Sequence, residues 1–495
     1  MRQDIFRPIS ATILLVLVFL QPAAAQDVSA KEAWSSFRDA AQENGIVIQS
    51  QGTTDYGTSI VVQNVRVFHE DEPNDLVISM PELRVEPRGA AIALIPSPQF
   101  TADLRYGRGY ERELTFSHNG EVVVDESDDR IAVDFLFGQL GIVLTEATRR
   151  GVPLDEALDL SFDTLAGRFL AEREGTLEFA LSADTTRYDL RFVAPSSGTP
   201  MNQTSQVEIS GLQLEVSGTE LDMLSDEDGM LPLAFDAGFS AHLLMSTQSS
   251  FGNSQQVLDG APVTINSAAG ASEFAIDIAD GTFSAHSFGR DAQISGGMGP
   301  FQGNVELEEL GLSVSFPLVV TPDDQTLHYR MNLDNLTVSP ELLQMVGAQD
   351  FAGESVSLGF EVSTLARMIE EIGPDFGEGD TPPFEVTSVS LDRLLTRVGD
   401  TELTGAGAFA FLGGIMASIE AERPNGTGDF TFDLVGGDQM LTRLSAMGLI
   451  PEDQQFIVRM MMNGLGRPIA EDHLRSEVAI RPGGVITVNG APLPF

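Results

Sequence analysis

The sequence predicts a mainly β protein, built from long, bent antiparallel sheets with a few short helices (α+β). Three observations carry this prediction. Apolar and polar residues alternate over most of the chain, 48 glycines and 25 prolines interrupt the alternation, and helical spacing appears only in short stretches. Alternation of this kind turns one face of each strand toward a core and the other toward water. We therefore expect sheets with one apolar face and one polar face.

The first segment, Met1–Ala25, has the features of a secretory signal peptide. Arg2 and Arg7 precede a 12-residue apolar stretch, Ile9–Leu20, and a proline and an Ala-x-Ala site follow it. As a helix, this stretch would rise about 18 Å, which is short of the roughly 30 Å hydrocarbon core of a bilayer. We expect cleavage after Ala25, export to the periplasm, and no transmembrane segment in the cleaved chain.

A helix is expected at the start of the cleaved chain, because Ser29 and Glu32 form a capping-box pattern. Trp34, Phe37 and Ala41 share one face of that helix. Trp34 is the only tryptophan of the chain. We interpret it as an anchor that docks the helix on a core, with stacking on a ligand as the alternative.

One strand pattern recurs: apolar-x-apolar-x-x-apolar-x-apolar. In a regular strand the extra residue would move the second apolar pair to the opposite face. A β-bulge or a corner restores the face, and the inner residues are polar or turn-forming pairs such as Gln63-Asn64, Ser210-Gly211 and Asp334-Asn335. We therefore expect bent strands. The pattern occupies Ile60–Val67, Ile78–Val85, Val207–Leu214, Val305–Leu312, Met331–Val338 and Phe384–Leu391.

Helical spacing is confined to short later stretches. We expect helices over Pro340–Val346 and Ser363–Ile372, and a C-terminal αα-hairpin from Met440 to Gly464 with a methionine-rich face. Stretches rich in Pro and Gly, Ala194–Pro200 and Gly373–Pro383, suggest domain boundaries. The predicted organisation is a signal peptide (1–25), an N-terminal helix with a β-rich region (26–197), a β-rich region with short helices (198–378), and strands with the helical hairpin (379–495).

The charge balance argues against several function classes. The chain has 28 basic and 73 acidic residues and a net charge of −45, so we expect no binding to nucleic-acid phosphates. An anionic membrane surface would repel such a chain as well. It contains no cysteine, which excludes thiolate nucleophiles and Cys-ligated metals. Lys31 is the only lysine, so almost no candidate for lysine-based catalysis exists.

No motif identifies a reaction or a cofactor. The six histidines are scattered, and no Gly-x-Ser-x-Gly, Walker-type or His-Glu-x-x-His motif occurs. Acidic clusters such as Asp125–Asp129 leave the binding of a metal cation open. Carboxylate pairs able to serve a hydrolase cannot be distinguished among 73 acidic residues. We expect no cofactor, and the sequence favours a non-enzymatic protein.

The C-terminal region is similar to a known family. The run Met447–Gln454 precedes a methionine-rich helix, and Leu474–Val478 and Gly484–Leu493 follow it, while Phe316–Leu318 and Leu336–Leu342 lie upstream. These segments resemble domain of unknown function 2125 (DUF 2125), a family of secreted, acidic proteins of Gram-negative bacteria. The resemblance implies a periplasmic protein of uncharacterised role, and it supplies no catalytic residue.

The leading interpretation is a protein that binds an apolar ligand, such as a lipid, on the concave face of a bent sheet. The candidate ligand-binding residues are Leu212, Leu310, Met460 and Met461. Ordinary core packing is the other interpretation of the methionine-rich helix face. Two other functions stay open: an envelope scaffold that docks a protein partner through a sheet edge, and a hydrolase that uses a carboxylate pair.

Overall fold

The structure is a computed structural model. It describes residues 29–493 except 44, 90, 108, 127–129, 173–174, 195–200, 220–234, 236–237, 259–260, 299–300, 321, 371–383 and 421–423. The predicted signal peptide, the predicted linker at 373–383, and most of the linker at 194–200 and of the cluster at 125–129 lie outside the described residues. The chain divides into two compact units. Unit 1 is Met1–Leu221 with Leu243–Asn266, and unit 2 is Asp222–His242 with Ser267–Phe495.

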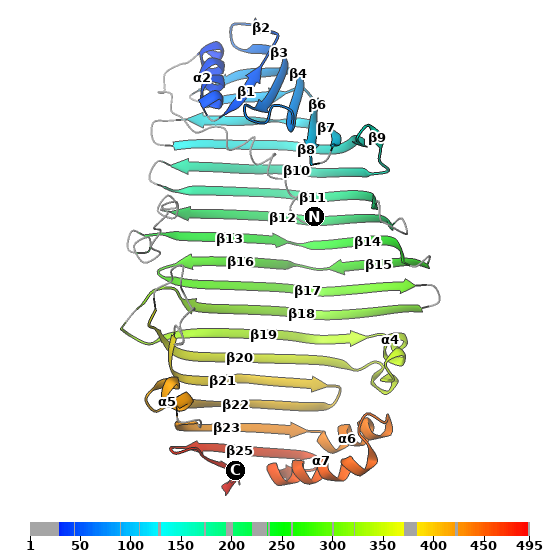
Figure 1. Cartoon of the computed structure of the whole chain (residues 1–495), viewed down its shortest axis with the longest axis vertical. Coiled ribbons are helices and arrows are strands. Elements are labelled where there is room, and N and C mark those ends of the chain that lie inside the picture. The colour runs from blue at the N-terminus through cyan, green and yellow to red at the C-terminus, as the bar shows by residue number, and fades with distance from the viewer. Residues whose placement is uncertain are drawn as a thin grey trace. The chain divides into compact units, whose positions relative to one another are not determined.

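Unit 1 is an antiparallel sheet with one helix packed on it (Figure 1). The pairing runs β1–β3–β4–β6–β7–β8–β10–β11–β12–β14, β2 also pairs with β3, β5 pairs with β4 and β7, and β9 pairs with β8. Most connections are therefore hairpins between strands that follow one another in the sequence. The elements are α2 (Ala30–Glu43), β1 (Ile46–Gln49), β2 (Gly52–Asp55), β3 (Ile60–His69), β4 (Leu76–Arg88), β5 (Ala91–Pro96), β6 (Gln99–Tyr106), β7 (Tyr110–Glu126), β8 (Arg130–Arg149), β9 (Val152–Pro153), β10 (Ala157–Glu172), β11 (Leu177–Ala194), β12 (Met201–Thr219) and β14 (Ser249–Leu258).

Unit 2 is a second run of antiparallel pairs, β16–β17–β18–β19–β20–β21–β22–β23–β25–β26–β27, with β24 on β25. Figure 1 shows α4, α6 and α7 at one end of these strands and α5 at the other. The elements are β16 (Ser272–Ala279), β17 (Thr282–Met298), β18 (Phe301–Pro317), β19 (Gln325–Val338), α4 (Pro340–Met345), a 3₁₀ turn (Gln349–Phe351), β20 (Ser355–Met368), β21 (Phe384–Val398), β22 (Thr401–Phe411), α5 (Gly414–Glu420), β23 (Gly426–Val435), α6 (Gly437–Ala446), α7 (Glu452–Leu465), β24 (Arg467–Ala470), β25 (His473–Arg481), β26 (Val485–Val488) and β27 (Ala491–Pro492). β13 (Ser240–Thr247) and β15 (Ala261–Ala269) each contain residues of both units.

The predicted N-terminal helix and its capping box are confirmed. Helix α2 begins at Ala30, the hydroxyl of Ser29 accepts the N–H of Glu32, and the Glu32 carboxylate accepts the N–H and the hydroxyl of Ser29. The hydrogen bonds from Ser29 lower the pKa of Glu32, because they favour the ionised carboxylate. The Ser29 hydroxyl and the Glu32 carboxylate therefore accept hydrogen bonds from main-chain N–H groups that have no partner within the helix.

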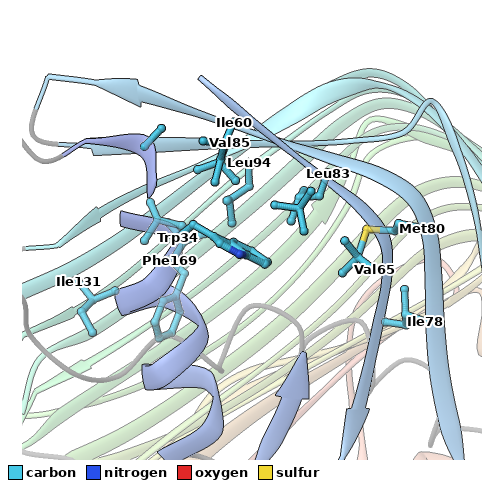
Figure 2. Close-up of a cluster of buried hydrophobic side chains, with 14 of the residues drawn as sticks. Trp34, Ile60, Val65, Ile78, Met80, Leu83, Val85, Leu94, Ile131 and Phe169 are labelled. Atoms are coloured by element: carbon cyan, nitrogen blue, oxygen red, sulfur yellow. The ribbon is translucent and has the colours of Figure 1, made fainter. Parts of the chain in front are cut away.

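The interpretation of Trp34 as a core anchor is also confirmed. Trp34 is 6% exposed and belongs to the main hydrophobic core of unit 1. Figure 2 shows its indole among side chains of the sheet, and Phe37 stacks on it with ring centroids 5.6 Å apart. The other members of this core come from several strands and include Ile60, Val62, Val65, Ile78, Met80, Leu83, Val85, Leu94, Ile131 and Phe169. Helix α2 is held on the sheet by this burial.

Left-handed residues interrupt strands at places where the recurring pattern predicts a bulge or a corner. Asn64 in β3 has φ 53°, and Val62 and Val65 on either side of it are buried in the same core. In β19, Asn335 has φ 52°, and the register with β20 shifts between Leu333 and Leu336. Each left-handed residue interrupts the alternation once, so the apolar residues before and after it face the same way.

The helix predictions met mixed outcomes. The helix expected after Ser339 is α4. The helix expected over Ser363–Ile372 is wrong, because Ser363–Met368 continues strand β20 and pairs with β19 and β21. The two C-terminal helices exist as α6 and α7, and Arg459 of α7 contacts Asp438 of α6 at 2.8 Å. Their packing as an αα-hairpin stays a prediction. None of the helices in the described part of the chain is long and apolar enough to cross a bilayer.

Candidate functional site

The candidate site is one face of the sheet in unit 2. Along β18, the apolar residues Leu310, Leu312 and Val314 alternate with Gly311 and Ser313. Residues directly opposite each other on antiparallel strands point to the same face of the sheet, so the register extends this apolar surface to the neighbouring strands. We call it the apolar face. In β18–β20 it consists of Leu310, Leu312, Val314, Phe316, Leu327, Tyr329, Met331, Leu333, Leu358, Phe360, Val362 and Thr364.

The apolar face continues through β21–β25. Three rows of cross-strand partners show it: Thr364, Val389, Phe409, Gly428 and Ile480; Val362, Leu391, Gly407, Phe430 and Val478; and Phe360, Leu394, Gly405, Phe432 and Ser476. None of the residues named in these rows or in β18–β20 is charged. The face is therefore apolar across eight consecutive paired strands, β18–β23 and β25 with β17 (Phe283 and Ala285) at its start.

Phenylalanine rings lie over glycines on this face. A Cβ atom added to Gly405 would come within 2.5 Å of Phe432 Cδ1, and one added to Gly407 within 2.4 Å of Phe430 Cδ1. Each glycine is the direct cross-strand partner of the phenylalanine that covers it. Since the ring occupies the place of a missing side chain, this part of the apolar face is smooth and shields the backbone from water.

The charged side chains of the same strands form ion pairs between residues that alternate with the apolar face. Arg290 contacts Glu309 at 3.1 Å between β17 and β18, and Arg397 contacts Glu402 at 2.7 Å between β21 and β22. Because side chains alternate along a strand, these pairs lie on the opposite face. The sheet of unit 2 thus has one ionic face and one apolar face.

The ion pair at Asp433 is the best defined of these contacts. Arg475 lies 3.0 Å from its carboxylate and His473 lies 2.9 Å from it. The hydrogen bond from Arg475, followed by that from His473, lowers the pKa of Asp433. Both partners stabilise the ionised form, so this carboxylate has a structural role in joining β23 to β25.

Acidification is expected to weaken this part of unit 2. Because the pKa of Asp433 is lowered in the folded state, its ionised form adds stability that is fully present above the unfolded pKa of about 3.9 and is lost as the pH falls through the folded value. Thermal unfolding measured from about pH 5 downward should show a smaller loss for Asp433→Asn than for the wild type. Asp453→Asn, an exposed carboxylate on α7, should behave as the wild type. Equal acid sensitivity of Asp433→Asn and the wild type would contradict this expectation.

The apolar face contains a hollow of about 480 Å³ near one end of its strands. Val314, Phe316, Leu327, Tyr329 and Val362 of the apolar face line it, together with Phe384. The polar residues of this lining are Ser315, His328, Tyr329 and Thr364. A ligand seated here would therefore meet hydrocarbon and aromatic surface with few polar atoms.

Large side chains in the middle of the apolar face are exposed. Leu310 is 47% exposed, Leu312 43% and Phe360 37%. The large apolar side chains on one face of a sheet are normally buried, because that face packs against a core. Figure 1 places the helices of unit 2 at the ends of the strands, so among the described elements none lies across this area. Contiguous exposed apolar patches are typical of interaction surfaces, so this face is the candidate site.

The structure places the predicted ligand-binding residues on different elements. Leu310 lies in the apolar face of unit 2. Leu212 lies in β12 of unit 1, directly opposite Ala183 of β11. Met460 and Met461 lie in α7, where both are 57% exposed, and not in a strand. Leu310 is therefore joined to other apolar strand residues, and the two methionines belong to a separate surface.

Sequence reasoning missed the aromatic part of the site. Tyr329, Phe360, Phe430 and Phe432 come together only through the pairing of strands. The alternation of aromatic residues with charged or polar ones along each strand was an available signal, but it does not reveal which strands are neighbours. No group of three or more His, Asp or Glu side chains arranged for a metal occurs in the part of the chain that the structure describes. No family model matches the chain, and a search of curated proteins finds no match.

Proposed function

We propose that the protein binds the hydrocarbon part of a lipid on the apolar face of unit 2. The observation that carries this proposal is a charge-free sheet face that is open to solvent, although one residue in five of the chain is charged. The resemblance to DUF 2125 contributes no functional residue, and the proposal does not depend on it.

Hydrocarbon suits this surface better than a polar ligand does. The main-chain groups of β18–β23 are paired within the sheet, so they offer no hydrogen bonds to a ligand. A polar or charged ligand would lose its contacts with water without replacement. Each methylene group that leaves water is stabilised by about 0.8 kcal/mol. An acyl chain therefore gains free energy along its whole length on this face.

The alternative of an envelope scaffold that docks through a sheet edge has no comparable support. The edge strand β27 comprises only Ala491–Pro492. Short edge strands and proline are features that protect an edge from pairing with another chain. The wide exposed apolar face, rather than this edge, is therefore the better candidate for an interaction surface of unit 2.

We further propose that the protein acts outside the cytoplasm. The support is the sequence of Met1–Ala25, whose charged, apolar and small-residue segments follow the order of a cleaved signal peptide.

The test is native mass spectrometry of the protein purified without detergent, compared with a denatured sample. We expect the chain to begin at Gln26 and to carry additional mass that matches a lipid and is lost on denaturation. Leu312→Glu should abolish the additional mass, because it places a carboxylate in the middle of the apolar face, where hydrocarbon cannot solvate it.

The matched control is Ser313→Glu, the next residue of β18, whose side chain points to the ionic face. It adds the same charge to the same strand and should keep the lipid mass. A wild-type chain without additional mass, or equal loss in the two variants, would reject lipid binding on this face. Since Leu312 is 43% exposed, its substitution leaves the packing of the sheet largely unchanged.

A further inference from the structure

Helix α7 carries an apolar stripe that no described residue covers. Phe456, Ile457, Met460, Met461 and Leu465 lie on one side of the helix at the spacing i, i+1, i+4, i+5 and i+9, and their exposed fractions run from 42% to 72%. We call these five residues the α7 stripe. Large apolar side chains exposed side by side on one helix mark an interaction surface.

The orientation of the helix is fixed by contacts on its other side. Met462 Cε lies 2.8 Å from the place where a Cβ atom of Gly437 would be, and Arg459 contacts Asp438 at 2.8 Å. Both contacts hold α7 against α6. The α7 stripe therefore points away from the protein, and the contacts with α6 keep it exposed in unit 2.

We propose that the α7 stripe docks unit 2 on the surface of an uncharged lipid layer. An amphipathic helix binds in the interface by burying its apolar side between the lipid headgroups. The charges of the helix and of the chain determine the kind of surface. The only cation within α7, Arg459, is held by Asp438, and the chain has a net charge of −45. Anionic lipids would repel such a helix, whereas zwitterionic lipids would not.

The same charge argues against a second copy of the chain as the partner. Two chains of −45 that meet through one helix would bring like charges together over a small apolar contact. A zwitterionic lipid layer carries no such penalty. The charge therefore favours a lipid surface over self-association.

The position of α7 links this surface to the apolar face. Met462 also lies near Leu434, because both approach the same point at Gly437, and Leu434 belongs to the row of β23 that contains Phe432. Helix α7 thus adjoins the end of the strands that bear the apolar face (Figure 1). In this reading, which rests on the proposed function for its purpose, a lipid enters or leaves the apolar face where α7 meets the layer.

The experiment is flotation of the full-length protein with phosphatidylcholine vesicles. The wild type should bind, and Phe456→Ser/Ile457→Ser should bind at least about tenfold less, because two large apolar side chains no longer enter the interface. The control is Tyr56→Ser/Val152→Ser, which removes two side chains of unit 1 that are 66% and 63% exposed and lie outside the α7 stripe. It should bind as the wild type does.

Several outcomes decide the matter. Replacing part of the phosphatidylcholine by phosphatidylglycerol should weaken binding, and stronger binding would overturn the choice of an uncharged surface. Equal binding by the α7 variant and the wild type, or a dimer in sedimentation velocity that this variant dissociates, would overturn the docking role. Vesicle binding by a wild type that carries no lipid would support this inference and reject the proposed function. A lipid-loaded wild type that ignores vesicles would do the reverse.

Discussion

Trp34→Ala is expected to lower the free energy of opening of helix α2 by about 3–5 kcal/mol, the usual cost of removing a large aromatic side chain from a core. Trp34 is 6% exposed, and its ring lies among core residues of the sheet (Figure 2). Phe37 would also lose its stacking partner. Hydrogen exchange measured by mass spectrometry on peptides from Ala30–Glu43 would report the change, because local opening controls the exchange of these amides.

The control for this prediction is Tyr56→Ala. Tyr56 is an aromatic residue of the same unit that is 66% exposed, so its removal should change the free energy of opening by less than about 0.5 kcal/mol. Trp34→Phe should fall between the wild type and the alanine variant, because a smaller ring leaves a smaller cavity. If Trp34→Ala left the protection of α2 within 1 kcal/mol of the wild type, the helix would not depend on this residue for its docking.

Gly405→Val is expected to destabilise unit 2 by about 1–3 kcal/mol. The new side chain would begin 2.5 Å from Phe432 Cδ1, at a place the aromatic ring already occupies. The backbone of Gly405 does not have the positive φ that would exclude other residues. The cost is therefore steric, and differential scanning calorimetry should show it as a lower transition temperature.

Two further variants isolate this contact. Ala406→Val lies next in β22 and is exposed on the opposite face, so it should leave the transition within about 0.5 kcal/mol of the wild type. Adding Phe432→Leu to Gly405→Val should restore part of the lost stability, because leucine leaves free some of the volume that the new valine side chain needs. A double variant less stable than the sum of the two single variants would refute the clash as the cause.

The bent strands were predictable because their signal is local. A pair of residues set between two apolar pairs points to a bulge or a corner, and the structure has left-handed residues at Asn64, Gly211 and Asn335, in three of the six occurrences of the pattern. Asparagine and glycine adopt this conformation at low cost. The pairing of Ile60–Val67 with Ile78–Val85 also follows from the short distance between them in the sequence.

The incorrect helix over Ser363–Ile372 shows where local reasoning stops. Leu365, Ala366, Arg367 and Met368 are good helix formers, so their propensity favours a helix. In the structure, β19 and β21 offer this segment hydrogen-bonding partners on both sides. These partners lie far away in the sequence. Tertiary pairing therefore outweighs a propensity of a few tenths of a kcal/mol per residue.

The sequence predicts the type of candidate site, an apolar sheet surface, but not most of the residues that form it. An apolar surface on a bent sheet follows from alternation, and Leu310 is a member of it. The placement of phenylalanines over Gly405 and Gly407 depends on the register between β22 and β23. A slip of one residue would turn every side chain to the other face, and nothing within either strand fixes that register. The sequence pattern therefore predicts that an apolar face exists, but it does not predict which residues of neighbouring strands meet on it.

The order of strands in unit 2 has an evolutionary consequence. From β18 to β22, each strand pairs with the strand before it and the strand after it in the sequence. Stability in such a chain is a sum of nearest-neighbour terms, as in linear arrays of structural modules. Duplication or deletion of two adjacent strands would therefore keep the alternation of directions and faces intact. The width of the apolar face can thus change in steps of one hairpin, while the other strands keep their pairing.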